Sequence, residues 1–294
     1  MRFAQIGQQL RAFRLESGLR AEEIAARLGI SRAALYRYEK GEVIKLETLR
    51  RLAELLKISP LALLGIGIEY FSRSAGFFER IADLEEEAEQ ILFVGGAFCP
   101  LLMSPEVEAF LAEAWPPLAE GGEEPLVIRA GMQQLLAQFA DRRRRYQARR
   151  PALHVVLEEG AVREVLTEGL LPGIALGEGL RRRAIALARA EVATLANLME
   201  ALPLGVQIGV LDAPGVTSPF ELLRGREKTF VCISPFRPDT PPHLVLGVAM
   251  ITAADEALAG YQRIAEQAWA RARKGSEGAT RLRRLLAAAE RAEH

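Results

Sequence analysis

Few side chains of this chain have the types and the spacing that acid–base or metal chemistry requires. His154 is the best candidate, because Glu158 and Glu159 follow it closely and an imidazole beside carboxylates can transfer a proton or bind a metal ion. His154 lies within an apolar run, however, and this pattern favours a structural histidine beside two surface carboxylates. The sequence also lacks the motifs of phosphate-cradling loops, zinc peptidases and serine hydrolases. We therefore expect no catalytic site, no metal site and no cofactor.

The two cysteines, Cys99 and Cys232, each lie within an apolar string, as small core residues do. Cys99 has no histidine near it in the sequence and no charged neighbour that would lower the pKa of its thiol, so it is a poor nucleophile. One pair of cysteines in 294 residues is not a disulfide framework, and the absence of a CxxC motif argues against a metal site.

The strongest charge feature is the arginine run at 142–145, which Arg149 and Arg150 extend. The run is suited to a second phosphate-binding face or to a clamp on the acidic segment at 85–89. The alternative is a solvated helix end whose positive charge complements the helix dipole. The sequence favours this alternative.

Charge is unevenly distributed along the chain. Its 38 Lys and Arg residues balance its 38 Asp and Glu residues, which excludes a uniformly basic surface. Residues 1–64 nevertheless contain 12 Lys and Arg against 7 Asp and Glu, whereas residues 71–130 contain 3 against 12. The sequence therefore predicts a basic N-terminal head joined to a body that is acidic where it begins.

The chain has no segment typical of membrane targeting or insertion. Its N-terminus lacks the apolar run of a signal peptide, and its apolar stretches fall far short of the ~20 residues that cross a bilayer. Half of its 294 residues are hydrophobic, so the chain is long enough for two domains with substantial cores. We expect a soluble protein of the cytoplasm without a membrane partner.

Residues 3–64 are predicted to form five short helices. Gly18 ends the first helix, whose apolar residues recur at helical spacing, and Gly29 ends the second. Ser31 is a good N-cap for the third helix, a fourth follows, and Pro60 begins the fifth. Two short helices joined by a tight glycine turn are the helix-turn-helix pattern.

The head resembles the DNA-binding domains of the Xre or lambda-repressor-like family over roughly residues 3–64. Apolar, glycine and charged positions fall in the family register at 10–14, 18–19, 23–32 and 35–41. The resemblance implies that the helix beginning near Ser31 enters the major groove of double-stranded DNA, where side chains read base edges. Ala21 departs from the family pattern, which places a glutamine at that position. The alternative is a helical bundle that contacts protein through ordinary solvated charges.

The resemblance also implies roles for individual residues. Arg32 and Arg37 are the candidates to donate paired hydrogen bonds to guanine, and Tyr36 offers an apolar contact for a thymine methyl group. Arg14 on the first helix and Glu39 at the end of the third occupy the positions of a partly buried structural ion pair. The outward positions expected to face bases are Arg32, Ala33, Tyr36 and Arg37, and those expected to face phosphates are Arg20, Ser31, Lys40 and Lys45.

The rest of the chain is predicted to be an α/β domain. Residues 65–76 combine glycines and serines with aromatic side chains, which indicates a packed joint before a body at 77–294. The fold class is therefore α/β overall, with an all-α five-helix head followed by an α/β C-terminal domain. Strands are expected at 91–94, 126–128, 153–157, 206–211, 220–224, 229–234 and 244–252. Helices are expected at 77–89, 105–115, 132–149, 180–202 and 253–294, the last interrupted near 275–278.

The body resembles, more weakly, the uncharacterised C-terminal module of many actinobacterial Xre-type regulators over about residues 77–274. The matching segments are 101–106, 151–159, 202–211 and 219–220. This resemblance implies a regulatory role and offers no catalytic residues. The order of helices and strands around 91–96 and 206–236 also resembles phospholipase-D-like domains, but their histidine–lysine signature is absent, which excludes that chemistry.

These features together predict a sequence-specific DNA-binding transcriptional regulator of the nucleoid. Its body is expected to sense a small-molecule or protein effector, or to form a homodimer, because the helices at 180–202 and after 253 offer much apolar surface. Two alternatives remain open at this point. One is an antitoxin or adaptor whose body binds a protein partner, and the other is an enzyme with a DNA-targeting head.

Overall fold

Helix stops and caps that are local in the sequence give residues 3–64 five helices. The computed structural model describes residues 3–64, 67–120, 124–212, 216, 218–237 and 240–292. Gly29 ends the second helix in the left-handed region, with a φ of 67°, and the Ser31 hydroxyl caps the third by accepting from the backbone N–H of Ala34. The helices are α1 (Phe3–Ser17), α2 (Ala21–Leu28), α3 (Arg32–Glu39), α4 (Leu46–Leu56) and α5 (Pro60–Leu63). The expected five-helix head is confirmed.

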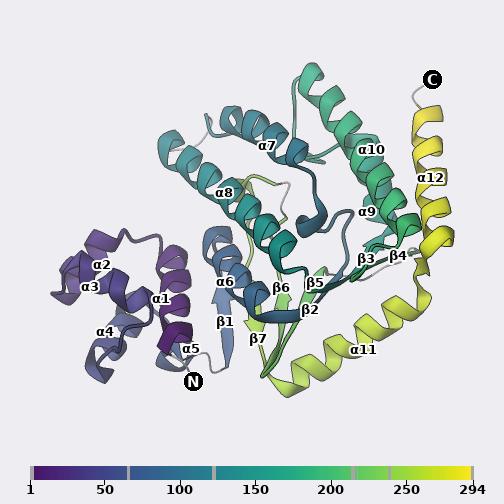
Figure 1. Ribbon diagram of the computed structural model, residues 1–294. Helices are drawn as coiled ribbons and strands as arrows, with labels where there is room; N and C mark the ends of the chain where they lie inside the picture. Colours follow the sequence, from purple (N-terminus) through teal and green to yellow (C-terminus); the bar gives the residue numbers. More distant parts are fainter. Residues whose placement is uncertain are drawn as a thin grey trace.

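The described part of the body is built on one mixed eight-stranded sheet (Figure 1). The strands lie in the order β1-β7-β6-β5-β2-β3-β4-β8. β3 is parallel to both of its neighbours, β2 and β4, whereas the other pairings are antiparallel. The α/β fold class is therefore confirmed. The strands are β1 (Ile68–Phe71), β2 (Ala88–Val94), β3 (Ala152–Glu158), β4 (Val206–Leu211), β5 (Phe220–Gly225), β6 (Thr229–Ile233), β7 (Ala249–Thr252) and β8 (Arg273–Lys274).

Helices cover both faces of the sheet. Figure 1 shows α11 (Asp255–Arg271) on one face, and the other helices of the body lie over the opposite face or beside it. Leu258, Tyr261 and Trp269 of α11 pack against buried residues of the sheet and are partly buried, whereas Ile264 on the same helix is 41% exposed. The remaining helices are α6 (Ser74–Glu87), α7 (Pro105–Leu118), α8 (Pro125–Arg149), α9 (Glu159–Glu168), α10 (Glu178–Ala201) and α12 (Gly275–Arg291).

Much of the expected joint is part of the body. Residues 68–71 form β1, an edge strand that pairs with β7 at the far end of the chain, with Ile68 opposite Thr252. Ser74 then begins α6, and the two residues 65–66 lie outside the described residues. A strand this short between glycines and serines gives little local signal, because its pairing with β7 and its contacts with α1 and α6 are all long-range.

Other expected elements need correction. The strand expected at 126–128 is wrong, because these residues lie at the start of α8, where Pro125 sets the helical φ. The strand expected at 244–252 shrinks to β7, and α9 is an additional helix. The C-terminal helix is interrupted at 272–274 rather than at 275–278, because β8 pairs with β4 there.

Helix α1 of the head packs against α6 of the body, and we call this contact the α1–α6 seam. The rings of Phe13 and Phe71 stack with their centroids 5.5 Å apart, and Phe71 also contacts Phe77 edge-on at 6.1 Å. Gly76 allows the close approach, because a Cβ at this position would lie 2.9 Å from the carbonyl oxygen of Ala12. The seam therefore joins the hydrophobic cores of head and body into one.

Polar groups fix the register of the α1–α6 seam. Glu69 on β1 is 4% exposed, accepts from Gln9 of α1 at 3.0 Å, and forms a two-point ion pair with Arg80 of α6 at 2.9 and 3.1 Å. At the other end of the seam, the carboxylate of Glu16 accepts from the backbone N–H groups of Ser72 and Arg73, just before α6 begins. Buried charge is costly without such partners, so this network allows few alternative arrangements of head and body.

The arginine run of α8 clamps the C-terminal end of α6. Arg142 is 2% exposed and donates to both carboxylate oxygens of Glu85, at 2.9 and 2.6 Å. Arg145 pairs with Glu86 at 2.6 Å, and Arg149 donates to the backbone carbonyls of Glu85 and Ala88, where α6 ends and β2 begins. The preference for a solvated helix end is therefore wrong for these three arginines.

Asp83 of α6 gives the fold a testable pH dependence. It lines a polar cavity at the α1–α6 seam with Arg11 and Glu79, and burial followed by the negative charge of Glu79 raises its pKa to about 7. The folded state thus binds this proton more tightly than the unfolded state, so stability falls as pH rises from about 4 to about 7. We expect Asp83→Asn to raise the Tm at pH 8 and to leave it nearly unchanged at pH 4.

Thermal unfolding of the full chain, followed by circular dichroism at both pH values, measures this effect. Glu87→Gln, an exposed carboxylate on the same helix, is the control and should shift the Tm little at either pH. An equal gain from Asp83→Asn at pH 4 and pH 8 would contradict the assignment.

Candidate nucleic-acid interface

The third helix presents a narrow exposed face, which we call the α3 face: Arg32, Ala33, Tyr36 and Arg37. Leu35 points the other way and is fully buried in the core of the head, so the helix can take only one rotation about its axis. Arg32, Ala33 and Arg37 are exposed and Tyr36 is half-buried. In Figure 1, α2 and α3 lie on the side of the head away from the body, so the body leaves this face open.

Arg32 is held by partners on its own and the preceding helix. Its guanidinium donates to the Tyr36 hydroxyl at 3.0 and 3.2 Å and lies 5.2 Å from the centre of that ring. It also pairs with Glu22 of α2 at 2.7 Å. The hydrogen bond with Tyr36, followed by the charge of Glu22, raises the pKa of Arg32, so the side chain stays cationic.

Arg37 has a single acidic partner of its own. Its Nε donates to the carboxylate of Glu42 at 3.0 Å, and both side chains remain more than half exposed, at 57% and 54%. Exposed pairs of this kind contribute about 0–1 kcal/mol, so a better acceptor can replace Glu42 at small cost. Arg37 is thus preoriented along the α3 face and available to a ligand.

The four residues expected to face phosphates divide into two kinds. Ser31 uses its hydroxyl to cap α3, and the backbone N–H of Arg20 donates to the carboxylate of Glu23 at 2.8 Å at the start of α2. Lys40 and Lys45 are exposed and form no ion pair with the described residues. The two lysines, which lie on either side of the loop after α3, are therefore the cations most accessible to a nucleic-acid backbone.

The expected pair of Arg14 and Glu39 forms at the base of α3. Arg14 donates to both carboxylate oxygens of Glu39, at 2.5 and 3.1 Å, and the side chains are 14% and 6% exposed. Because Arg14 lies on α1 and Glu39 ends α3, this pair ties the exposed helix to the helix that docks on the body. It stabilises the position of the α3 face without belonging to it.

Four residues around the α3 face escaped the sequence analysis. Glu22 and Glu42 place carboxylates beside its two arginines, and no residue-type pattern in the sequence indicated them. Val43 and Leu46, at 68% and 79% exposed, flank Lys45 and offer apolar surface next to the lysines. Val43 lies in the loop between α3 and α4, and Leu46 is the first residue of α4.

The residues weighed for catalysis are not brought together. The His154 ring stacks on Trp269 at 5.4 Å and its Nδ1 contacts Gln90, while Glu159 pairs with arginines of α9 and α12. Glu158 instead accepts from the backbone N–H of Val216. Burial raises the pKa of the Cys99 thiol far above the neutral range, which makes it a poor nucleophile. Each of these side chains has a structural partner or a core position.

The comparison with protein families agrees with this geometry. Residues 5–64 match the family model described as a helix-turn-helix domain. This segment is a helix-turn-helix domain. The match spans α1 to α5 of the head and leaves the body unassigned. No helix in the described residues is long and apolar enough to cross a membrane.

Two solved structures are similar to the chain at low identity. One is TrmBL2, an archaeal chromatin protein described as showing a novel mode of DNA binding, with 13% identity, 78% of this chain and 61% of that chain covered, and a TM-score of 0.33. The other is phosphatidylserine synthase of Haemophilus influenzae Rd KW20, with 8% identity, 92% and 59% covered, and a TM-score of 0.37. This chain thus spans about three fifths of the length of both proteins. No curated protein matches it.

The Arg14–Glu39 pair within the helix-turn-helix domain can be tested by deletion. Arg14→Ala leaves Glu39 buried without its counter-charge, so we expect a loss of about 3 kcal/mol in the free energy of unfolding. Arg50→Ala is the matched control, because Arg50 is 56% exposed and its pairs with Glu47 and Glu54 should contribute less than about 1 kcal/mol. Urea unfolding of the full chain measures both. Equal losses would mean that the buried pair contributes no more than a surface pair.

Proposed function

We propose that this protein is a sequence-specific DNA-binding transcriptional regulator. In the proposed complex, α3 of the helix-turn-helix domain enters the major groove with Arg32 and Arg37 directed at base edges. The observation that supports this most is the exposed α3 face, which the buried pair of Arg14 and Glu39 holds at a fixed position. Lys40 and Lys45 then contact the phosphates beside it.

The carboxylates next to the α3 face favour selective over general DNA binding. In the free protein, Glu22 neutralises Arg32 and Glu42 neutralises Arg37. A phosphate backbone repels both carboxylates, whereas a guanine in the correct position offers each arginine two acceptors in exchange for its surface pair. At a wrong sequence the carboxylates still repel the phosphates, but the arginines gain few hydrogen bonds in return. The unfavourable contact therefore discriminates against wrong sequences.

We also propose that the regulator binds DNA as a homodimer and that the body responds to an effector. One helix-turn-helix domain makes few contacts, and such domains commonly bind two half-sites about one helical turn apart. The α1–α6 seam supports a link between body and DNA, because it is a packed contact through which a change in α6 reaches α1. Light scattering of the full chain tests the dimer.

The role of Arg37 is tested against that of Lys45. A selection from random duplexes with the full chain supplies the preferred site, and equilibrium binding is then measured on that site and on a scrambled duplex. Arg37→Ala should cost about 1–3 kcal/mol on the preferred site only and relax the base preference at one position. Lys45→Ala should weaken both duplexes alike and lower the salt slope by about one. Sequence-independent losses from both variants would refute Arg37 as a base contact.

If Glu42 repels the DNA backbone as proposed, its substitution should increase the affinity for non-specific DNA. Glu42→Gln removes the repulsion of phosphate and frees Arg37, so binding to the scrambled duplex should strengthen by about 1 kcal/mol while the preferred site gains less. Glu54→Gln on α4 is the control, because it also removes an exposed paired acid but lies away from the α3 face. An identical gain from the two variants would show that only net charge matters.

A further inference from the structure

The body contains a pocket of about 310 Å³ at the edge of the sheet where the parallel strands β2 and β3 end. Gly96 follows β2, Glu158 is the last residue of β3, and both line the pocket. The first two residues of β5 line it from the neighbouring strand. Small molecules bind open α/β sheets outside the carboxyl ends of their strands, and this volume lies at the lower end of the range of roughly 300–1,000 Å³ for such sites.

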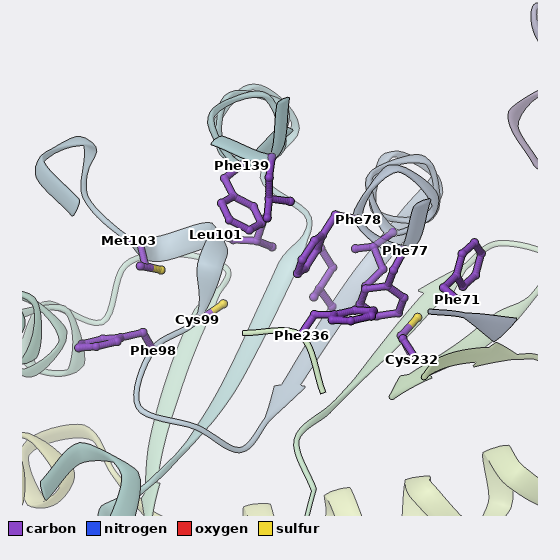
Figure 2. Packing of buried hydrophobic residues seen from close by; sticks show 14 of the residues in the cluster. Phe71, Phe77, Phe78, Phe98, Cys99, Leu101, Met103, Phe139, Cys232 and Phe236 are labelled. Atoms are coloured by element: carbon purple, nitrogen blue, oxygen red, sulfur yellow. The ribbon is translucent and has the colours of Figure 1, made fainter. Parts of the chain in front are cut away.

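The wall of the pocket is mainly aromatic. Figure 2 shows Phe77 and Phe78 with Phe236 beside them, and Phe98 and Met103 across the same space above the sheet. The face of an aromatic ring carries partial negative charge and attracts cations. Six phenylalanines line the pocket: Phe77, Phe78, Phe93, Phe98, Phe220 and Phe236.

One carboxylate among these rings has only a distant counter-charge, which it shares with a second acid. Glu221, at the start of β5, is 12% exposed and accepts no hydrogen bond from any described residue. Nη2 of Arg142 lies 4.0 Å from it, whereas Nε and Nη2 donate to Glu85 at 2.9 and 2.6 Å and Nη1 is buried without a hydrogen-bond partner. The thiols of Cys99 and Cys232 are near as well, and burial keeps both uncharged. Glu85, Arg142 and Glu221 together therefore leave one negative charge unbalanced when both carboxylates are ionised.

The charged groups at the rim already have partners. Glu158 accepts from the backbone N–H of Val216, and Arg237 lies 3.9 Å from Glu164 of α9. Glu158 is itself an acid, and the one cation of the two, Arg237, has an acidic partner in Glu164. The interior of the pocket is therefore negative and apolar, a combination suited to an organic cation.

We propose that this pocket binds a small organic ammonium ion with an apolar substituent, its positive charge facing Glu221 and its carbon atoms against the phenylalanines. The inference names the class of effector for the proposed regulator. Binding of the ion does not depend on the proposed function, whereas its role as an effector rests on it. The ion supplies the counter-charge that Arg142 does not, and the rings add cation–π attraction that a neutral molecule of the same shape lacks.

The site is also placed to influence the helix-turn-helix domain. Phe77 and Phe78 line the pocket from α6, and Phe77 contacts Phe71, which stacks on Phe13 of α1. Four rings in contact thus connect the ligand site with the helix that carries Arg14. A ligand that shifts Phe77 or Phe78 therefore changes the packing on which the position of the α3 face depends.

The binding test uses the full chain and three probes of similar size: 2-phenylethylammonium, 2-phenylethanol and phenylacetate. In titration calorimetry at pH 8, the ammonium ion should bind at least tenfold more tightly than the alcohol, and phenylacetate should bind most weakly. Glu221→Gln should reduce the affinity for the ammonium ion about tenfold and leave that for the alcohol unchanged. Glu178→Gln, an exposed acid on α10, should change neither.

The pH dependence is a second readout. Burial, partly opposed by Arg142 and reinforced by Glu85, raises the pKa of Glu221 to about 7. The ammonium ion requires the ionised carboxylate, so its affinity should fall about tenfold from pH 8 to pH 6, and this fall should be absent in Glu221→Gln. Equal affinity for ammonium ion and alcohol, preference for phenylacetate, or an unaltered Glu221→Gln variant would each refute the proposal.

The proposed regulator function and the proposed ligand site can be refuted independently. If the ammonium ion binds as expected but the affinity for the selected duplex does not change with it, the ligand site stands and its role as an effector site is refuted. If random-duplex selection finds no preferred DNA sequence, the proposed function is refuted, whereas the calorimetric result on the pocket is unaffected.

Discussion

Glu69 lies 4% exposed on the edge strand β1, and a carboxylate at that depth is stable only when its charge is matched. Gln9 supplies a donor from α1, and Arg80 supplies two from α6. The edge of the sheet, the first helix of the body and the first helix of the head therefore meet at one ionised group. Removing any of the three partners leaves a buried polar atom unpaired. The stacked rings of Phe13 and Phe71 add an apolar contact between the head and the body.

Arginines of the described residues pair mainly with carboxylates of the same chain. Arg80, Arg142 and Arg14 each form two-point contacts with buried carboxylates, and even the exposed Arg32 and Arg37 have acidic partners. The excess of positive charge in residues 1–64 is therefore a weaker guide to DNA binding than its count suggests. The two ion pairs of the α3 face are exposed and replaceable, whereas the three buried pairs are not, and exposed pairs of the same kind also occur elsewhere on the surface.

The sequence was informative where the determinants are local. Gly29 and Ser31 mark the turn between α2 and α3 within a few residues, and the Arg14–Glu39 pair followed from a family register. In the body, β1 and β8 are too short to show a pattern and exist because β7 and β4 offer them pairing partners. The composition of 126–128 favours a strand, but these residues are helical because they follow Pro125 at the start of the long helix α8. The acids beside the α3 face and the carboxylate in the pocket are contacts across elements, which no local pattern encodes.

The α1–α6 seam also has a geometric consequence. Flexible tethers let two DNA-binding heads adapt to different distances between half-sites, because the linker absorbs the difference. Here Gly76 brings the backbones of α1 and α6 into direct contact and Glu16 anchors the segment between β1 and α6. In a two-fold assembly of this chain, the bodies rather than flexible linkers would fix the distance between the two helix-turn-helix domains. One base pair inserted between the half-sites rotates one of them by about a tenth of a helical turn. A rigid assembly would not adapt to this rotation, so it would bind only one spacing of the half-sites.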